Sequence, residues 1–175
     1  MPPTEAAGPV SQLIDFVENN EEWVAPIVFL LAFAESLVVV SLFVPSTLLF
    51  LGIGAAHSAA DGSFVTTWLA GSTGAVLGDV VSFAFGWYFK RDVMRLWPFS
   101  TMPRLLARSR LMFARYGYLA IVVGKFLGNF RPFLPIVAGA LRMPWRVFIP
   151  ASIVSSFLWA GAFLAPGYGV VTLFK

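Results

Sequence analysis

The sequence predicts an all-α integral membrane protein in which two opposed re-entrant helical hairpins accompany spanning helices, as in inverted-repeat transporters. Hydrophobic residues make up 58% of the 175 residues and charged residues only 12%, whereas soluble domains carry about 25% charged residues. Charges and prolines interrupt two of the apolar runs, and such breaks are tolerated where a segment lines a wet cavity walled by protein. Two broken segments in matching places indicate a transport site.

The chain is expected to form one unit, because 175 residues leave no room for a separate soluble domain. An N-terminal amphipathic segment is expected over residues 1–22, followed by a single membrane domain over residues 23–175. The apolar side chains of residues 10–22 share one helical face, which is typical of a helix lying at the membrane surface. No signal peptide is expected, because residues 1–22 carry acidic residues and no Lys or Arg.

The membrane domain is expected to repeat an order of broken hairpin and span. Its elements are a hairpin over about 23–56, a span over about 64–89, a basic surface helix over about 101–116, a second hairpin over about 118–141 and a last span over about 147–165. Both spans have the length of about 20 residues that a bilayer requires. Gly74 and Gly78 give the first span a GxxxG motif for close helix contact. Pro166 is expected to end the last span.

The first broken segment holds an acid. An apolar helix is expected over residues 23–43, with Glu35 inside it, and the Pro45-Ser46 pair is expected to break it. The two pieces are as consistent with one kinked span as with a re-entrant hairpin. His57 follows in a polar loop, where we expect it to be solvated.

The second broken segment holds two cations. Lys125 and Arg131 lie in an otherwise apolar stretch whose break is expected over residues 128–135. Backbone carbonyl groups freed at the two breaks need hydrogen-bond partners. The residues expected to form and support the breaks are Pro45, Ser46, Thr47, Asn129, Pro132 and Pro135.

Basic residues are concentrated in the middle of the chain. Residues 90–116 contain seven Lys or Arg residues besides a single acid, Asp92, so the positive-inside rule places this block in the cytoplasm. Anionic lipid headgroups are its expected partner. Nucleic acid is not expected, because membrane segments flank the block.

The residue types present exclude several kinds of chemistry. The chain has no cysteine and one histidine, so neither a transition-metal site nor any other cofactor is expected. Lys125, Arg131 and Pro132 resemble the opening of a membrane lipid phosphatase motif, but no histidine follows position 57 to act as nucleophile or acid. There is no Walker A motif for ATP. The sequence therefore predicts no enzyme.

Four ionisable residues at expected membrane depth are the candidate substrate- and proton-binding site: Glu35, Asp79, Lys125 and Arg131. Glu35 is interpreted as a proton carrier or as half of a structural ion pair. Lys125 and Arg131 are interpreted as a clamp for a lipid phosphate or as side chains that extend to the headgroup level. Asp79 would coordinate substrate or join two helices. Because unpaired membrane charges are unfavourable, Glu35 and Arg131 are predicted to be linked directly, or through Lys125, Asp79 or water.

These features together resemble the DedA family of bacterial membrane proteins. The resemblance extends from about Phe29 to Pro166 and rests on Glu35, Pro45, the Gly78-Asp79 pair and the stretch Gly124–Gly139. It implies two opposed re-entrant hairpins with spanning helices. It also implies the movement of lipids across the inner membrane, with undecaprenyl phosphate and phospholipids as the leading substrates and proton coupling in some members.

The individual residues match the family's pattern to different degrees. Glu35 matches an acidic residue that the family requires, and Arg131 matches the second of two required arginines. Lys125 stands where the first arginine is usual, and Lys is a point charge rather than a planar fork. Thr47 stands where some members have a second acid, and Ser46 replaces a glycine, which weakens the expectation of proton coupling through a pair of acids.

The predicted function is a lipid transporter, or flippase, of the bacterial inner membrane that moves a phosphate-headgroup lipid with the help of protons. Its partners would be membrane lipids, protons and, in a homo-oligomer, further copies of the chain. One alternative is a small-ion or proton-coupled exporter. The other is a membrane scaffold without transport, whose buried charges only stabilise packing.

Overall fold

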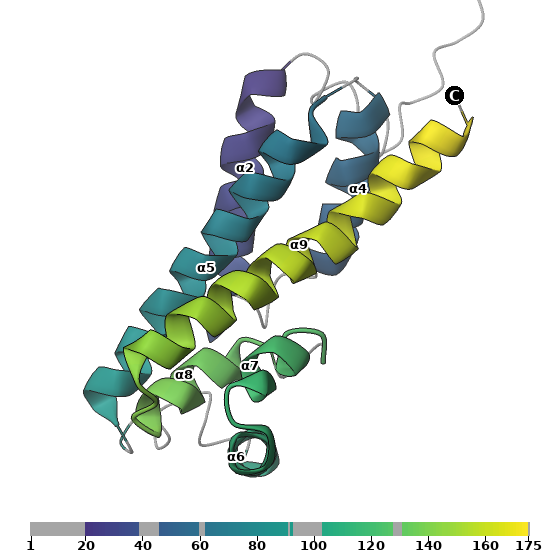
Figure 1. Ribbon diagram of the computed structural model, residues 1–175. Helices are drawn as coiled ribbons and strands as arrows, with labels where there is room; N and C mark the ends of the chain where they lie inside the picture. The colour runs from purple at the N-terminus through teal and green to yellow at the C-terminus, as the bar shows by residue number, and fades with distance from the viewer. Residues whose placement is uncertain are drawn as a thin grey trace, which may run out of the picture.

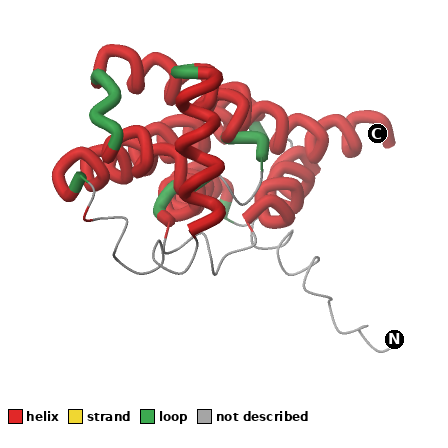
Figure 2. The backbone as a smooth tube through the Cα atoms, turned by 90° about the horizontal axis from the view of Figure 1, so that it is seen from below, coloured by secondary structure: helices red, strands yellow, loops and turns green. Residues whose placement is uncertain are grey.

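The computed structural model describes residues 20–38, 46–59, 62–90, 92, 103–127 and 131–174. Within these ranges the chain is helical and contains no strand, as Figure 2 shows. The helices are α2 (Glu21–Glu35), α4 (Ser46–Ala59), α5 (Phe64–Phe89), α6 (Pro103–Tyr116), α7 (Leu119–Gly124), α8 (Phe133–Ala140) and α9 (Trp145–Phe174). The predicted amphipathic segment lies outside the described residues up to position 19, and its last two residues belong to α2.

The long helices α5 and α9 form the centre of the molecule. In the described part of the chain, they are the two helices long and apolar enough to cross a membrane. In Figure 1, α2 and α4 lie beside them at one end, and α6, α7 and α8 lie together at the other end. The helix α2 packs on α5, α4 packs on α9, and α8 packs on α5. Two groups of short helices are therefore held by one central pair.

Glycines on α5 allow two helices to approach it at the backbone. A Cβ atom at Gly74 or Gly78 would overlap the backbone of α2 at Phe29 or Phe33. At the other end of α5, a Cβ at Gly86 would overlap α8 in the same way, and Gly139 of α8 has the same relation to α5. The predicted close contact at the GxxxG motif is confirmed, and α2 is the partner.

The last helix is longer than predicted. We expected Pro166 to end it, but α9 continues through both Pro150 and Pro166 to Phe174. Each proline removes one backbone hydrogen bond, and the packing of α9 along α4 and α5 outweighs that loss. Prolines are tolerated in this way within membrane helices.

The first helix, in contrast, is shorter than predicted. The helix α2 ends at Glu35, rather than near residue 43, and Ser36 is its C-terminal cap. The backbone carbonyl of Ser36 accepts a hydrogen bond from the Ser82 hydroxyl of α5, at 2.9 Å. That tertiary contact occupies the carbonyl that a continuing helix would use. The break therefore begins at Ser36, and Pro45 lies outside the described residues.

The first residues of the expected polar loop after the first hairpin are helical. The helix α4 runs to Ala59 and includes His57, which is buried with 4% of its surface exposed. The His57 ring packs edge-on against Tyr168 of α9, with 6.2 Å between ring centroids. The prediction that His57 is solvated was therefore wrong, because α9 extends far enough to cover it.

The second break is also narrower than predicted. The helix α8 begins at Phe133, with Pro132 as its N-terminal cap and Pro135 in its first turn. The first N–H groups of a helix have no partner within it, so Pro135 removes no hydrogen bond and frees no carbonyl. Pro135 belongs to the helix, not to the break that we predicted. Asn129 lies outside the described residues.

Candidate substrate-binding site

All four predicted ionisable residues are buried, and they come from four different elements. Glu35 ends α2, Asp79 lies in the middle of α5, Lys125 follows α7 and Arg131 precedes α8. The exposed fractions of Glu35, Asp79, Lys125 and Arg131 are 8%, 2%, 4% and 6%. Charged groups are almost never buried this deeply unless they are paired. The four residues form two ion pairs.

The first pair belongs to a closed polar network. The Lys125 ammonium group forms an ion pair with the Asp79 carboxylate and also donates a hydrogen bond to the Ser156 hydroxyl of α9. The Ser152 hydroxyl donates to Asp79 Oδ2 at 2.8 Å. Three elements, α5, α9 and the end of α7, are thus joined through side chains that satisfy one another.

The second pair, Glu35 and Arg131, keeps donor and acceptor atoms without hydrogen-bond partners among the described residues, and we call it the open pair. Arg131 Nη1 lies 2.5 Å from Glu35 Oε1, and the guanidinium lies over the ring of Trp159, with Cζ 3.5 Å from the ring centroid. Glu35 Oε2 and the Nε and Nη2 atoms of Arg131 are buried and have no hydrogen-bond partner among the described residues. The hydroxyl of the adjacent Ser36 is also buried without a hydrogen-bond partner among the described residues. Buried polar groups without partners are unfavourable, so this pair has binding capacity that no described residue uses.

The two pairs together are electrically neutral. Two carboxylates face two cations, so the four charges sum to zero. The predicted link between Glu35 and Arg131 is confirmed, and it is direct. Leaving one such charge unpaired in a membrane interior is unfavourable by at least about 2.5 kcal/mol, so each residue stabilises its partner.

The open pair has the chemistry to bind an oxyanion. Nε and Nη2 share one edge of the Arg131 guanidinium and project parallel N–H bonds, which match two oxygens of a phosphate. The unused oxygen of Glu35 is an acceptor for a proton or for a protonated phosphate oxygen. The cation of the closed pair, Lys125, has its donors directed to Asp79 and Ser156 instead.

The remaining predicted support residues fall at or beyond the edges of the described chain. Ser46 and Thr47 begin α4, but their side chains lie outside the described part of the structure. Pro45 and Asn129 lie outside it entirely. Their roles at the breaks stay predictions.

Sequence reasoning missed the contributions of α9 to the site. Ser152, Ser156 and Trp159 all contact the buried charges. Ser152 and Ser156 are four residues apart, so they lie on one face of an apolar helix. That spacing is the signal that would have identified them.

A helical chain with two apolar candidate spans and a neutral set of buried charges has the character of a membrane protein with a polar interior. Residues 43–169 match the VTT domain, and the chain belongs to this family, the DedA family of membrane proteins. The match covers both charge pairs except Glu35, which lies just before it.

Several bacterial relatives support this assignment. The chain is 37% identical over 153 residues to inner membrane protein YabI of Escherichia coli (strain K12), a match of 87% of this chain and 60% of YabI. It is 31% identical over 133 residues to inner membrane protein YohD of the same strain, covering 76% of this chain and 68% of YohD. Protein DedA of that strain is 28% identical over 160 residues, covering 89% of this chain and 73% of DedA. No solved structure matches the chain.

Proposed function

We propose that this protein moves a lipid with a phosphate headgroup, such as undecaprenyl phosphate or a phospholipid, across the bacterial inner membrane. The observation that carries the proposal is the open pair, in which Arg131 keeps Nε and Nη2 without a partner among the described residues. These two donors bind the phosphate while the lipid tails stay in the bilayer. Arginine suits this task because its planar fork matches phosphate geometry.

The burial of the site supports a mechanism of alternating access. Glu35 and Arg131 come from the two groups of short helices, one at each end of the central pair α5 and α9. In the proposal, residues of α2 and α4 and residues of α7 and α8 form two opposed re-entrant hairpins related by inverted topology. Rocking one hairpin against the other separates Glu35 from Arg131 and opens the site to one side of the membrane.

Within this mechanism, the two pairs have different roles. The phosphate bound at Nε and Nη2 replaces the Glu35 carboxylate as the counter-charge of Arg131, and Glu35 takes up a proton so that it is not left as an unpaired charge. Asp79 and Lys125 remain bonded to each other and hold α7 against α5 and α9. Lys125 therefore supports the site and does not itself clamp the phosphate.

The first experiment replaces the planar guanidinium group of Arg131 by the point charge of a lysine. In liposomes of defined lipids, Arg131→Lys is expected to lower the rate of leaflet exchange of a phosphate lipid by about tenfold to a hundredfold, because a charged hydrogen bond of about 1.5–3 kcal/mol is lost. Exchange is measured with and without a pH gradient. The exposed Arg146→Lys variant is the matched control and is expected to behave like the wild type.

Two rival functions make different forecasts for the same experiment. The neutrality of the four charges is the observation that favours a scaffold, and a scaffold would show no exchange in the wild type. A small-ion exporter would show ion movement across the liposome membrane without lipid exchange. Equal rates of lipid exchange by Arg131→Lys and the wild type would mean that the guanidinium donors of Arg131 do not bind the headgroup.

The proposal also places the basic block, residues 90–116, in the cytoplasm. The chain has no cysteine, so single cysteines at the exposed positions Ser63 and Ala107 report orientation cleanly. In intact cells, an impermeant thiol reagent is expected to label Ser63→Cys and not Ala107→Cys. The reverse pattern would overturn the orientation, and with it the inverted-topology argument.

A further inference from the structure

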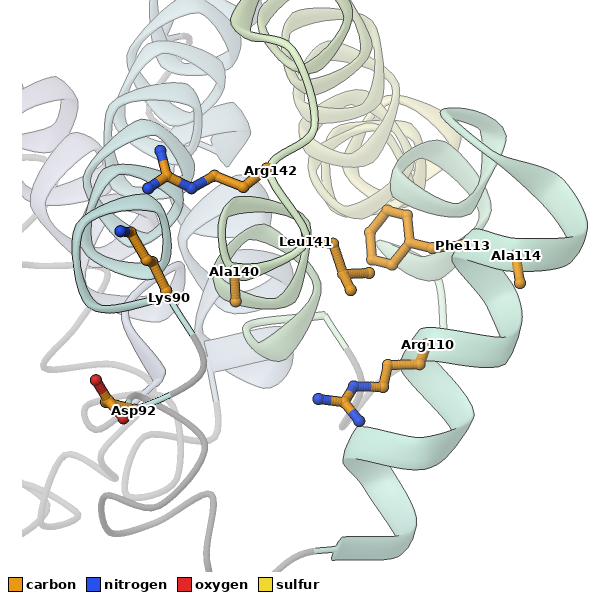
Figure 3. A pocket seen from close by; sticks show the side chains of 8 residues that line it. All are labelled: Lys90, Asp92, Arg110, Phe113, Ala114, Ala140, Leu141 and Arg142. Atoms are coloured by element: carbon orange, nitrogen blue, oxygen red, sulfur yellow. The ribbon is translucent and has the colours of Figure 1, made fainter.

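A second charged feature is made of different residues from the four buried charges. A cleft of about 1020 Å³ lies where the end of α5, the helix α6 and the end of α8 meet, as Figure 3 shows. Among the residues that the structure describes, its ionisable lining residues are Lys90, Asp92, Arg110 and Arg142. All four are exposed. Three cations against one carboxylate give this wall an excess of positive charge, which attracts an anion.

Two of these cations have an unfavourable backbone conformation. Lys90 has φ 51° and Arg142 has φ 60°, and they are the two non-glycine residues with positive φ among those that the structure describes. Side chains with a Cβ atom clash in this region, and glycine is the usual residue there. Strained residues concentrate at functional sites. The N–H groups of Arg142 and Met143 bond to the carbonyls of Gly139 and Ala138, the pattern by which helices end at a residue of positive φ. Glycine is the usual residue at such an end, and a cation takes its place here.

A structural explanation covers only part of this arrangement. Lys90 follows the C-terminus of α5 and Arg142 follows the C-terminus of α8, where a cation interacts favourably with the helix dipole. A cation within the last helical turn would give the same benefit without positive φ. The dipoles also do not explain Arg110, which extends from α6 across the cleft from the other two (Figure 3).

Arg142 is further positioned by an aromatic ring. Its guanidinium lies over Trp87 of α5, with Cζ 4.6 Å from the ring centroid. A cation held on an aromatic face loses less conformational entropy when it binds an anion. The site is therefore partly pre-organised.

The other described residues of the lining are apolar, and they indicate the type of anion. Phe113, Ala140 and Leu141 lie beside the cations in the cleft. The exposed aromatic side chains of Tyr116 and Tyr118 are at the end of α6, and such residues favour the level of the lipid headgroups. A free inorganic anion would gain nothing from apolar walls, whereas a lipid carries its phosphate next to apolar chains.

We propose that this cleft binds the phosphate of an anionic glycerolipid at the membrane surface, with Lys90, Arg110 and Arg142 as its ligands. The inference goes beyond the proposed function, because it requires binding only and holds whether or not the protein moves lipid.

The test uses the full chain in detergent micelles. Binding of dioctanoyl phosphatidic acid, of dioctanoylglycerol and of inorganic phosphate is measured by thermophoresis in the wild type, Lys90→Gly, Arg142→Gly and the double variant. Glycine accepts positive φ without strain, so these substitutions remove the cations while preserving the backbone. Arg146→Gly would disturb α9, so Arg146→Gln, an exposed cation outside the cleft, is the control.

We expect phosphatidic acid to bind the wild type more tightly than inorganic phosphate, and dioctanoylglycerol not to bind measurably. Each glycine variant should weaken the binding of phosphatidic acid by about tenfold and the double variant by more, since each cation supplies a charged hydrogen bond. Thermal unfolding of every variant, measured alongside, shows that loss of binding is not loss of fold. Wild-type affinity in the double variant would overturn the proposal, and equal affinity for inorganic phosphate would overturn its assignment to a lipid.

The same titration in an Arg131→Lys background separates this cleft from the buried site. The weakening caused by Arg142→Gly should be unchanged there, because Arg142 and Arg131 line different sites. A failure of the proposed transport site would leave this difference intact. Loss of the Arg142→Gly effect in the Arg131→Lys background would assign all the binding to Arg131 and refute the cleft.

Discussion

Asp79→Asn is expected to lower the free energy of unfolding by about 3–5 kcal/mol, because it leaves the Lys125 ammonium group buried without a counter-charge. Lys125→Met should have an effect of the same size for the opposite charge. The double variant should recover most of the loss, since a neutral pair of similar volume needs no compensation. Unfolding is followed in mixed micelles by titration with a denaturing detergent, and the four proteins form a double-mutant cycle.

The cycle distinguishes a structural pair from a pair used in transport. If Asp79 and Lys125 only hold α7 against α5 and α9, the double variant should also exchange lipid at close to the wild-type rate. Additive losses in stability would show that the two charges do not depend on each other. A stable double variant without lipid exchange would indicate that Lys125 takes part in binding the phosphate. The exposed Arg146→Met variant serves as the control for removal of a cation.

Glu35→Gln is expected to have the largest effect on transport and to reduce net lipid exchange to the background of protein-free liposomes. The glutamine carbonyl still accepts a hydrogen bond from Arg131 Nη1, so the contact between α2 and the start of α8 persists. Glutamine cannot gain or lose a proton. The proton uptake that accompanies the replacement of the carboxylate by phosphate is therefore lost in this variant. Exchange is measured in liposomes with and without a pH gradient.

The outcomes for Glu35→Gln separate three mechanisms. A folded variant without exchange supports proton uptake at Glu35. A variant of lowered stability whose folded fraction exchanges lipid normally would make the Glu35–Arg131 pair purely structural. A well-folded variant with the wild-type rate and the wild-type response to pH would contradict any role for Glu35 in the cycle.

The parts of the fold that depend on local pattern were predictable from the sequence. The helix α5 coincides with the predicted span, because a stretch of 26 residues whose one charged member is Asp79 ends at the charged Lys90. The basic helix α6 also lies within its predicted range, since arginines alternate with an apolar face. The four buried charges were identifiable because ionisable groups within apolar runs must find partners.

Other features depend on contacts between distant residues, which the sequence pattern does not contain. The end of α2 is set by a hydrogen bond from Ser82, 46 residues away. The burial of His57 depends on α9 continuing past Pro166 to place Tyr168 against it. The difference between the closed and the open pair likewise depends on which serines of α9 reach Asp79 and Lys125. Composition cannot reveal such pairings.

The neutrality of the four buried charges has a consequence for membrane voltage. Moving one elementary charge through 100 mV changes the energy by about 2.3 kcal/mol, so an anionic lipid crossing alone would be driven or opposed by the membrane potential. If Glu35 takes up one proton for each singly charged phosphate that enters, the sum of charges at the site stays at zero. The lipid and the proton then cross the membrane together without moving net charge. In that case the pH difference and the lipid's own concentration difference across the membrane, and not the potential, set the direction of net movement.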